Sequence, residues 1–287
     1  MERLFDFCII GATKSATSWL QVAAMKHPEL AIVPHETYFF TKYYERGLDY
    51  LKPFLVSRRA GLLFGDYSND YLTESRLAAA RLHAHNPDMR LVVSLRNPVS
   101  RAESFYRMLY RGHRISGTPG QEIVPGTRMY DEGFYFERLR DFAEVFGRER
   151  LHVIVQEDIR RDPEAVLANY YRFLGVDNAF LPDGYGEAYN VSRKHRPKHS
   201  ALHQRLVQVV NSLAFLGERG TRIKQALRSS RIVGLYHRIN KGEQVAPLSV
   251  AEKARLARAY APDAARLSDW LGRDLVREWN LETLASA

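Results

Sequence analysis

The sequence has few cysteines and no long apolar segment. Cys8 is the only cysteine among 287 residues, which excludes an internal disulfide and predicts a reducing compartment. No apolar run approaches the ~20 residues that a membrane-spanning helix needs. The first residues, MERLFDFCIIG, also lack the basic-then-apolar pattern of a signal peptide. We therefore expect a cytoplasmic location without stable membrane insertion.

Motifs for nucleic acids and for metals are missing as well. The formal net charge is +9, but the basic residues are spread along the chain apart from a cluster at 193–199. The sequence has no zinc-ligand spacing, no RNA-binding aromatic motif and no basic helix followed by heptads. A small polyanionic ligand is therefore favoured over nucleic acid, and no metal is expected. The oligomeric state is not predicted.

Short apolar segments alternate with longer amphipathic ones through the first 185 residues. The apolar segments are rich in Val, Ile, Leu and Phe, which is typical of strands buried on both faces of a parallel sheet. The predicted strands are FDFCIIG, ELAIV, GLLFGD, RLVVSLR and LHVIVQE. The predicted helices are 16–26, 73–84, 100–111, 134–146 and 163–174. The alternation predicts a three-layer α/β fold with a central parallel sheet of about five strands.

The pattern changes after residue 185, where strands stop. A polar basic loop, NVSRKHRPKHS, is followed by helices predicted at 203–216, 221–228 and 249–271. Ser249 and Glu252 form a capping pattern at the start of the last helix. The Gly/Pro-rich stretch 112–133 is predicted to be a loop. We interpret 1–287 as one domain, with an α/β core at 1–185 and a mostly helical part at 186–287.

The stretch GATKSATSWL, residues 11–20, indicates an anion-binding loop. A strand, a loop and a helix in this order present backbone N–H groups and a helix N-terminus to a phosphate. The loop lacks the second glycine of the nucleotide-binding pattern G-x-x-x-x-G-K-[ST]. Its small, hydroxyl and basic residues are Lys14, Ser15, Ala16, Thr17 and Ser18. A plain helix start with one exposed lysine is the alternative.

A second anion motif follows the fourth predicted strand in LVVSLRNPVSRAESFY. Arg96 stands at the carboxyl end of that strand, where ligands bind in open α/β sheets. Ser104 comes eight residues later (104 − 96 = 8) on the following helix, about two turns along. The planar guanidinium of arginine suits phosphate. For Arg101, a cofactor contact and a helix-surface position remain open.

With these motifs in order, the chain resembles the sulfotransferases that use 3′-phosphoadenosine 5′-phosphosulfate (PAPS), in the branch with carbohydrate sulfotransferases and bacterial relatives. IIGATKSATSWL resembles the family's 5′-phosphosulfate loop and LRNPVSRAESFY its 3′-phosphate motif. HPELAIVPHETYFF, GDYSNDYL and the segment from PLSV to REW resemble further family blocks. Two departures stand out: Ser15-Ala16 replaces the Gly-Gly that often follows the lysine, and Tyr67 replaces a lysine of many carbohydrate members.

The resemblance implies a P-loop NTPase-like fold, PAPS as the donor, its product PAP and no metal. It assigns Lys14 and the amides from Ser15 to Trp19 to the phosphosulfate. It assigns Arg96 and Ser104 to the 3′-phosphate. The family's late basic loop, which closes over the cofactor, corresponds either to 193–200, with Lys198 as a contact, or to 240–244.

The base that takes the acceptor proton lies in PHETYFF, which offers His35 and Glu36. The family position favours Glu36, so Glu36 and Lys14 are the predicted catalytic residues. The acceptor is a hydroxyl or amine of a small molecule or glycan, with carbohydrate, lipid and natural-product acceptors all left open. Two other functions are weighed: a kinase-like P-loop enzyme, and a non-enzymatic module that binds nucleotides or nucleic acid.

Overall fold

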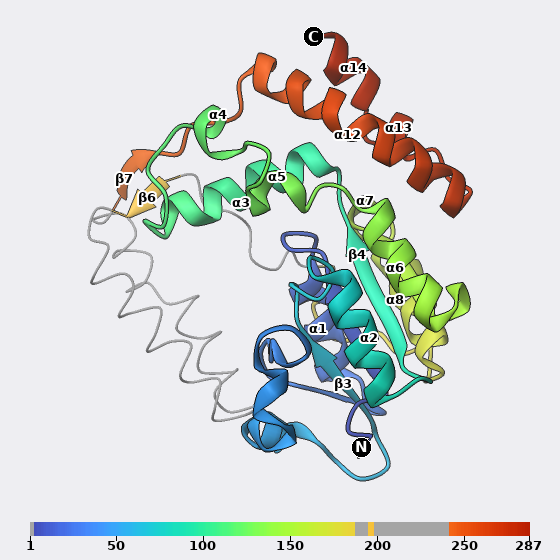
Figure 1. The fold of residues 1–287 in the computed structure, drawn as a ribbon. Helices are drawn as coiled ribbons and strands as arrows, with labels where there is room; N and C mark the ends of the chain where they lie inside the picture. Colours follow the sequence, from blue (N-terminus) through green and yellow to red (C-terminus); the bar gives the residue numbers. More distant parts are fainter. Residues whose placement is uncertain (1–2, 187–194, 198–240) are drawn as a thin grey trace.

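The computed structural model describes residues 3–186, 195–197 and 241–287 (Figure 1). A five-stranded sheet lies at its centre, with the strand order β2-β3-β1-β4-β5 and all neighbours parallel. The strands are β1 (Phe7–Gly11), β2 (Leu30–Ile32), β3 (Leu63–Tyr67), β4 (Arg90–Leu95) and β5 (Leu151–Val155). The prediction of a central parallel sheet of about five strands is confirmed. The central strand β1 is buried along its whole length, as its unbroken apolar sequence predicts.

The order of the strands creates a topological switch point beside β1. The chain leaves β1 through a helix toward β2 and β3 on one side, and it continues from β4 to β5 on the other. The connections that follow β1 and β4 therefore lead in opposite directions, and open α/β sheets bind ligands at such a point, beyond the carboxyl ends of the strands. The two motifs that carry Lys14 and Arg96 follow these two strands.

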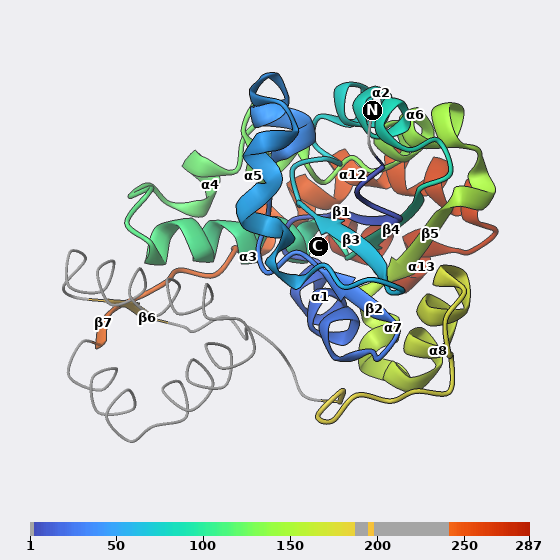
Figure 2. The ribbon, with the colours of Figure 1, turned by 90° about the horizontal axis from the view of Figure 1, so that it is seen from below.

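Helices cover both faces of the sheet. The helices are α1 (Thr17–Lys26), α2 (Ser75–His85), α3 (Pro98–Arg111), α6 (Phe136–Phe146), α7 (Gln156–Arg161) and α8 (Pro163–Leu174). In Figure 2, α1, α7 and α8 lie on one side of the sheet, and α2 and α6 lie on the other. The Tyr171 hydroxyl of α8 donates to the Ala23 carbonyl of α1 at 3.2 Å, and α2 packs against α6. This is the predicted three-layer arrangement.

The segment between β2 and β3 holds short helices that the sequence did not indicate. They are η1 (Phe39–Tyr43), η2 (Tyr44–Arg46) and η3 (Leu48–Ser57). Their aromatic rings pack on one another, with the Tyr43 and Tyr50 centroids 4.7 Å apart and those of Phe39 and Phe40 5.0 Å apart. The absence of a 3.6-residue period explains why no helix was predicted here. The predicted loop at 112–133 is likewise interrupted by α4 (Pro119–Glu122) and α5 (Arg128–Asp131).

The C-terminal part returns to the α/β core. The prediction that strands stop after residue 185 is wrong, because a two-stranded antiparallel sheet joins β6 (His195–Pro197) to β7 (Lys241–Gln244). The chain then forms α12 (Val250–Leu271), α13 (Leu275–Glu278) and α14 (Leu281–Ser286). Ser249 and Glu252 make the predicted capping box. Helix α12 packs on α3 and α6. The helices predicted at 203–216 and 221–228 lie outside the described residues.

Candidate active site

The loop after β1 has a backbone shape suited to an anion. Lys14 and Ala16 both adopt left-handed conformations, with φ of 71° and 66°. Turns of this kind direct neighbouring N–H groups into one concavity, which binds phosphate-like ligands. Ala16 precedes α1, so the N–H groups of the first helical turn face the same place. The Gly-Gly pair that often follows the lysine in the family would place a glycine at Ala16, where it would adopt this backbone more easily.

Close packing fixes the start of this loop. Gly11 has φ of 144°, and a Cβ atom there would lie 2.9 Å from the Leu72 Cβ. The Ala12 N–H donates to the Ser94 carbonyl of β4 at 2.8 Å. The loop is therefore attached to the neighbouring strand at the switch point before it turns into α1.

Two predicted site residues, Lys14 and Arg96, meet at this switch point. Arg96 follows the last residue of β4, and its Nη1 donates to the Lys14 carbonyl at 3.4 Å. Burial lowers the pKa of Lys14, and the nearby Arg96 and Arg111 lower it further. Burial, followed by the charge of Arg160, also lowers the pKa of Arg96. Like charges placed together in a partly buried site favour an anionic ligand.

The segments that carry these cations also contain polar atoms without hydrogen-bond partners. Four of them are buried and have no hydrogen-bond partner among the described residues, although most buried polar groups in proteins are paired. They are Thr13 Oγ1, Ser15 Oγ, Ser94 Oγ and Arg96 Nε. All four come from the β1 loop or the end of β4, and all can donate a hydrogen bond. This donor set fits the phosphate groups of PAPS.

Helix α3 carries the second half of the predicted 3′-phosphate motif. Ser104 is 8% exposed on this helix, and the Tyr135 hydroxyl donates to the Arg96 carbonyl at 2.8 Å just before the helix begins. Arg101 is fully buried, forms an ion pair with Glu132 at 3.4 Å and donates to the Met129 carbonyl. Arg101 therefore stabilises the packing of α3 against α5, and it is not a helix-surface residue.

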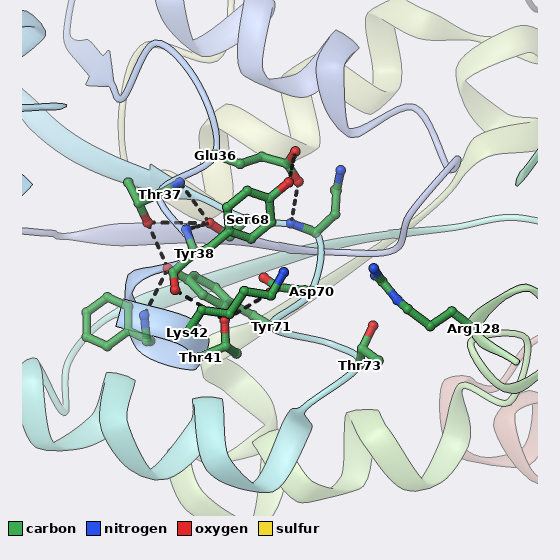
Figure 3. A network of polar contacts seen from close by, with 12 residues as sticks. Glu36, Thr37, Tyr38, Thr41, Lys42, Ser68, Asp70, Tyr71, Thr73 and Arg128 are labelled. Atoms are coloured by element: carbon green, nitrogen blue, oxygen red, sulfur yellow. Dashed lines mark hydrogen bonds and ion pairs between the residues drawn. The ribbon is translucent and has the colours of Figure 1, made fainter. Parts of the chain in front are cut away.

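Glu36 lies beyond the end of β2, and its carboxylate is held on both oxygens (Figure 3). The Tyr38 hydroxyl donates to Oε2 at 2.5 Å, and the Asn69 N–H donates to Oε1 at 3.0 Å. Asn69 follows β3, so Glu36 is connected to the neighbouring strand. The other candidate base, His35, packs its ring against Phe54 at 4.8 Å.

A chain of side-chain contacts joins Glu36 to the anion-binding loop. The Thr17 hydroxyl on the first turn of α1 lies 3.4 Å from the Tyr67 hydroxyl. The Asn69 amide donates to the same Tyr67 hydroxyl at 3.3 Å, and the Asn69 backbone holds Glu36. Burial and the charge of Glu36 raise the pKa of Tyr67, which keeps the phenol protonated. The predicted base and the predicted phosphosulfate loop therefore belong to one connected site.

The predicted contact at Trp19 has other surroundings. The Trp19 side chain is 5% exposed, and its indole N–H donates to the Tyr185 carbonyl at 2.8 Å. The Trp19 backbone N–H already donates to the Ala16 carbonyl at 2.9 Å, so this residue serves packing and the first turn of α1. Lys198 lies outside the described residues. The two late basic segments that were alternatives pair with each other where they are described, as β6 and β7, and β6 packs against α3.

Sequence reasoning missed three residues of this site. Thr13 and Ser94 were not recognised because a hydroxyl in an apolar or loop context resembles ordinary packing. Tyr38 was seen only as an aromatic neighbour of Glu36. A tyrosine two residues after a predicted base was the available signal, but its contact depends on an unusual backbone at φ 52°.

The buried carboxylate of Asp66 stabilises the backbone beside Glu36. Asp66 of β3 is fully buried and accepts from the Thr37 hydroxyl at 2.9 Å, the Tyr71 hydroxyl at 2.7 Å and the Tyr67 N–H at 2.7 Å. Burial raises the pKa of Asp66 to about 6, while the hydrogen bonds oppose the shift. Thr37 directly follows Glu36, so this network fixes the backbone that carries the predicted base.

This shift predicts how stability depends on pH. Folded Asp66 binds its proton more tightly than the unfolded chain does, so it destabilises the fold above pH 6, and this penalty disappears as the pH falls toward 4. Asp66→Asn removes the titration. The free energy of unfolding of each protein is measured in urea at pH 7 and at pH 4. Relative to Asp66→Asn, the wild type should become more stable by about 2–3 kcal/mol at the lower pH. A difference that is constant with pH would contradict this prediction.

Among the residues that the structure describes, no group of three or more His, Cys, Asp or Glu side chains is placed to hold a metal ion. The donors around Lys14 and Arg96 are hydroxyl and nitrogen groups, which are the partners of an anion.

Comparison with known proteins shows which family this chain is similar to. The model of the sulfotransferase family matches residues 64–180. Human heparan sulfate glucosamine 3-O-sulfotransferase 6 is 34% identical over 181 residues, which cover 58% of this chain and 51% of the human protein. The chain thus spans about half the length of that curated relative.

The fold of this chain has a counterpart among solved structures. A sulfotransferase from Alicyclobacillus acidocaldarius aligns with a TM-score of 0.66 at 23% identity, over 96% of this chain and 98% of that one. This confirms the predicted sulfotransferase-type fold with its P-loop-like core.

A further relative corrects the predicted location. The membrane-associated sulfotransferase kil1 of Dictyostelium discoideum is 32% identical over 300 residues, covering 72% of this chain and 61% of kil1. This finding contradicts the cytoplasmic location, so that prediction is wrong. It was based on the lack of a long apolar run, but a protein can associate with a membrane without spanning it. Within 3–186, 195–197 and 241–287, no helix combines the length and apolar character needed to cross a bilayer.

Proposed function

We propose that this protein transfers a sulfuryl group from PAPS to a hydroxyl or amine of a glycan acceptor. The observation that carries the proposal is the meeting of Lys14 and Arg96 at the switch point, among buried donors without partners. The chain of contacts through Tyr67 and Asn69 brings Glu36 to the same site. The match of residues 64–180 to the sulfotransferase family model supports the same reaction.

The residues divide the reaction between them. PAPS supplies the sulfuryl group when bound. Lys14 and the N–H groups that precede α1 stabilise the negative charge that develops on the 5′-phosphate side, and Arg96 and Ser104 hold the 3′-phosphate. Glu36 accepts the proton of the acceptor hydroxyl. Positioning and charge stabilisation supply most of the catalysis in such in-line transfers.

The acceptor class is supported by the relatives. The human relative carries heparan sulfate glucosamine in its name, so desulfated heparan sulfate is the first acceptor to try, followed by simpler amino sugars, lipids and phenols. We also propose that 1–287 acts as a single domain and that Lys198 reaches the cofactor. The packing of α12 on α3 and α6 supports the first proposal, and the contact of β6 with α3 supports the second.

Binding of PAP tests the donor site directly. Calorimetry should show micromolar binding of PAP, with much weaker binding of 5′-AMP and ATP. Arg96→Ala should weaken PAP binding about 10–100-fold, because a charge-assisted contact to phosphate is lost. Arg76→Ala is the matched control, since Arg76 is an exposed residue that pairs with Asp141.

Two outcomes would refute the assignment of the donor. ATP binding as tightly as PAP would favour the kinase-like alternative. Failure of the wild type to bind PAP, together with salt-dependent binding of DNA or RNA, would favour the nucleic-acid alternative.

A further inference from the structure

Tyr38 has a backbone conformation that tyrosine rarely adopts. Its φ is 52°, in the left-handed region that favours glycine. Such a conformation costs on the order of 1 kcal/mol or more, persists only where the surroundings impose it and often occurs at functional sites. Of the five non-glycine residues with positive φ among those described, Lys14 and Ala16 lie in the anion-binding loop and Tyr38 lies beside Glu36.

Contacts on both sides impose this conformation on Tyr38. Its N–H donates to the Ser68 hydroxyl at 2.9 Å, and its carbonyl accepts from the Lys42 N–H at 2.8 Å. The Lys42 ammonium lies 4.3 Å from the centroid of the Tyr38 ring and 3.2 Å from the Asp70 carboxylate. Figure 3 shows the Lys42 and Asp70 side chains next to each other and near Tyr38. The phenol is therefore fixed in place before any ligand binds.

The hydroxyl of the Tyr38 phenol contacts the Glu36 carboxylate. It donates to Oε2 at 2.5 Å, a short distance typical of a bond to a charged oxygen. Burial and the charge of Glu36 raise the pKa of Tyr38, so the phenol keeps its proton and remains a donor. The other charged or titratable groups near this pair are Tyr67, Asp70 and Lys42, with His35 next in sequence.

We propose that Tyr38 is a positioning residue for Glu36, which holds the carboxylate turned toward the acceptor hydroxyl. The role of Glu36 as base rests on the proposed function, but the hydrogen bond and its effect on Glu36 do not. An ionised carboxylate has about four acceptor directions. Tyr38 and Asn69 use one on each oxygen, which prevents rotation and leaves one on each oxygen for the substrate.

The direct test observes the Glu36 carboxylate without any substrate. Protein labelled with ¹³C at the glutamate carboxyl carbons gives one resonance that disappears in Glu36→Gln, and this resonance is recorded by NMR at neutral pH. Tyr38→Phe removes only the hydroxyl. Because that hydroxyl donates to the carboxylate, its loss should change the chemical shift of the Glu36 resonance, and it should lower kcat about tenfold with a smaller change in KM for the acceptor.

Tyr50→Phe is the matched control. The Tyr50 hydroxyl donates to the Thr37 carbonyl at 3.0 Å, in the same aromatic segment but not to the carboxylate, so its removal should leave the Glu36 resonance unchanged. An unchanged resonance in Tyr38→Phe, or an equal change in Tyr50→Phe, overturns the proposal. PAP calorimetry on the same samples separates this result from failure of the proposed function, since Tyr38→Phe should bind PAP as the wild type does.

Discussion

Replacing Glu36 with glutamine should lower kcat about 10²–10⁴-fold, the usual contribution of general base catalysis. Glutamine has nearly the same shape and can still accept the hydrogen bond from Tyr38 through its amide oxygen. It has no basic oxygen that can take the acceptor proton. The donor site on β1 and β4 is unchanged by the substitution, so PAP affinity should remain within about twofold of the wild type, well under 1 kcal/mol.

The experiment measures transfer of radioactive sulfate from PAPS to the acceptor found by screening, with calorimetry of PAP in parallel. Glu45→Gln is the control, because Glu45 is an exposed carboxylate on η2 that pairs with Arg81 at 2.9 Å. It should keep wild-type activity. A Glu36→Gln enzyme that works at the wild-type rate would show that another group, with His35 as the first candidate, removes the proton.

Removal of the Lys14 ammonium should lower kcat about 10²–10³-fold, as loss of one charge-stabilising donor does in other active sites. Lys14 is partly buried beside Arg96, so its charge acts in a region that water screens poorly. Negative charge develops on the phosphate as the sulfuryl group leaves, and the effect of Lys14 is therefore larger in the transition state than in the bound ground state.

Two variants distinguish the effect of the Lys14 charge from the effect of the left-handed backbone at this position. The φ of 71° is unfavourable for alanine but tolerated by asparagine. We expect kcat to fall to a similar extent in Lys14→Ala and Lys14→Asn. The Tm of Lys14→Asn should be higher than that of Lys14→Ala. Lys52→Ala is the control, since Lys52 is an exposed lysine paired with Asp49 at 2.8 Å. Full activity in Lys14→Asn would mean that the loop backbone, not the ammonium, stabilises the leaving group.

The sequence predicted the sheet and the two anion motifs because both depend on local patterns. Buried parallel strands require unbroken apolar runs, and these five runs became the five strands. The carboxyl ends of such strands meet at one edge, which brought Lys14 and Arg96 together as expected. Family resemblance supplied their order and their roles.

The parts that could not be predicted depend on contacts between distant segments. Arg101 looks like any arginine on an amphipathic helix, and its burial follows only from the position of Glu132, which lies 31 residues away in sequence. The orientation of Glu36 depends on Asn69 and on the backbone of Tyr38. Propensities describe single residues, so a left-handed tyrosine imposed by Ser68 and Lys42 cannot be seen in them.

The position of Glu36 has a consequence for how this enzyme type can be diversified. The groups assigned to the donor follow the two central strands β1 and β4, whereas Glu36 follows the edge strand β2 and leads into the aromatic helices η1 to η3. A graft that exchanges 39–57 between relatives would change the surface beside the base while leaving the donor loop and its strands intact. We therefore expect such a graft to alter acceptor choice while PAP binding is retained, which makes this aromatic segment the first place to engineer new acceptors.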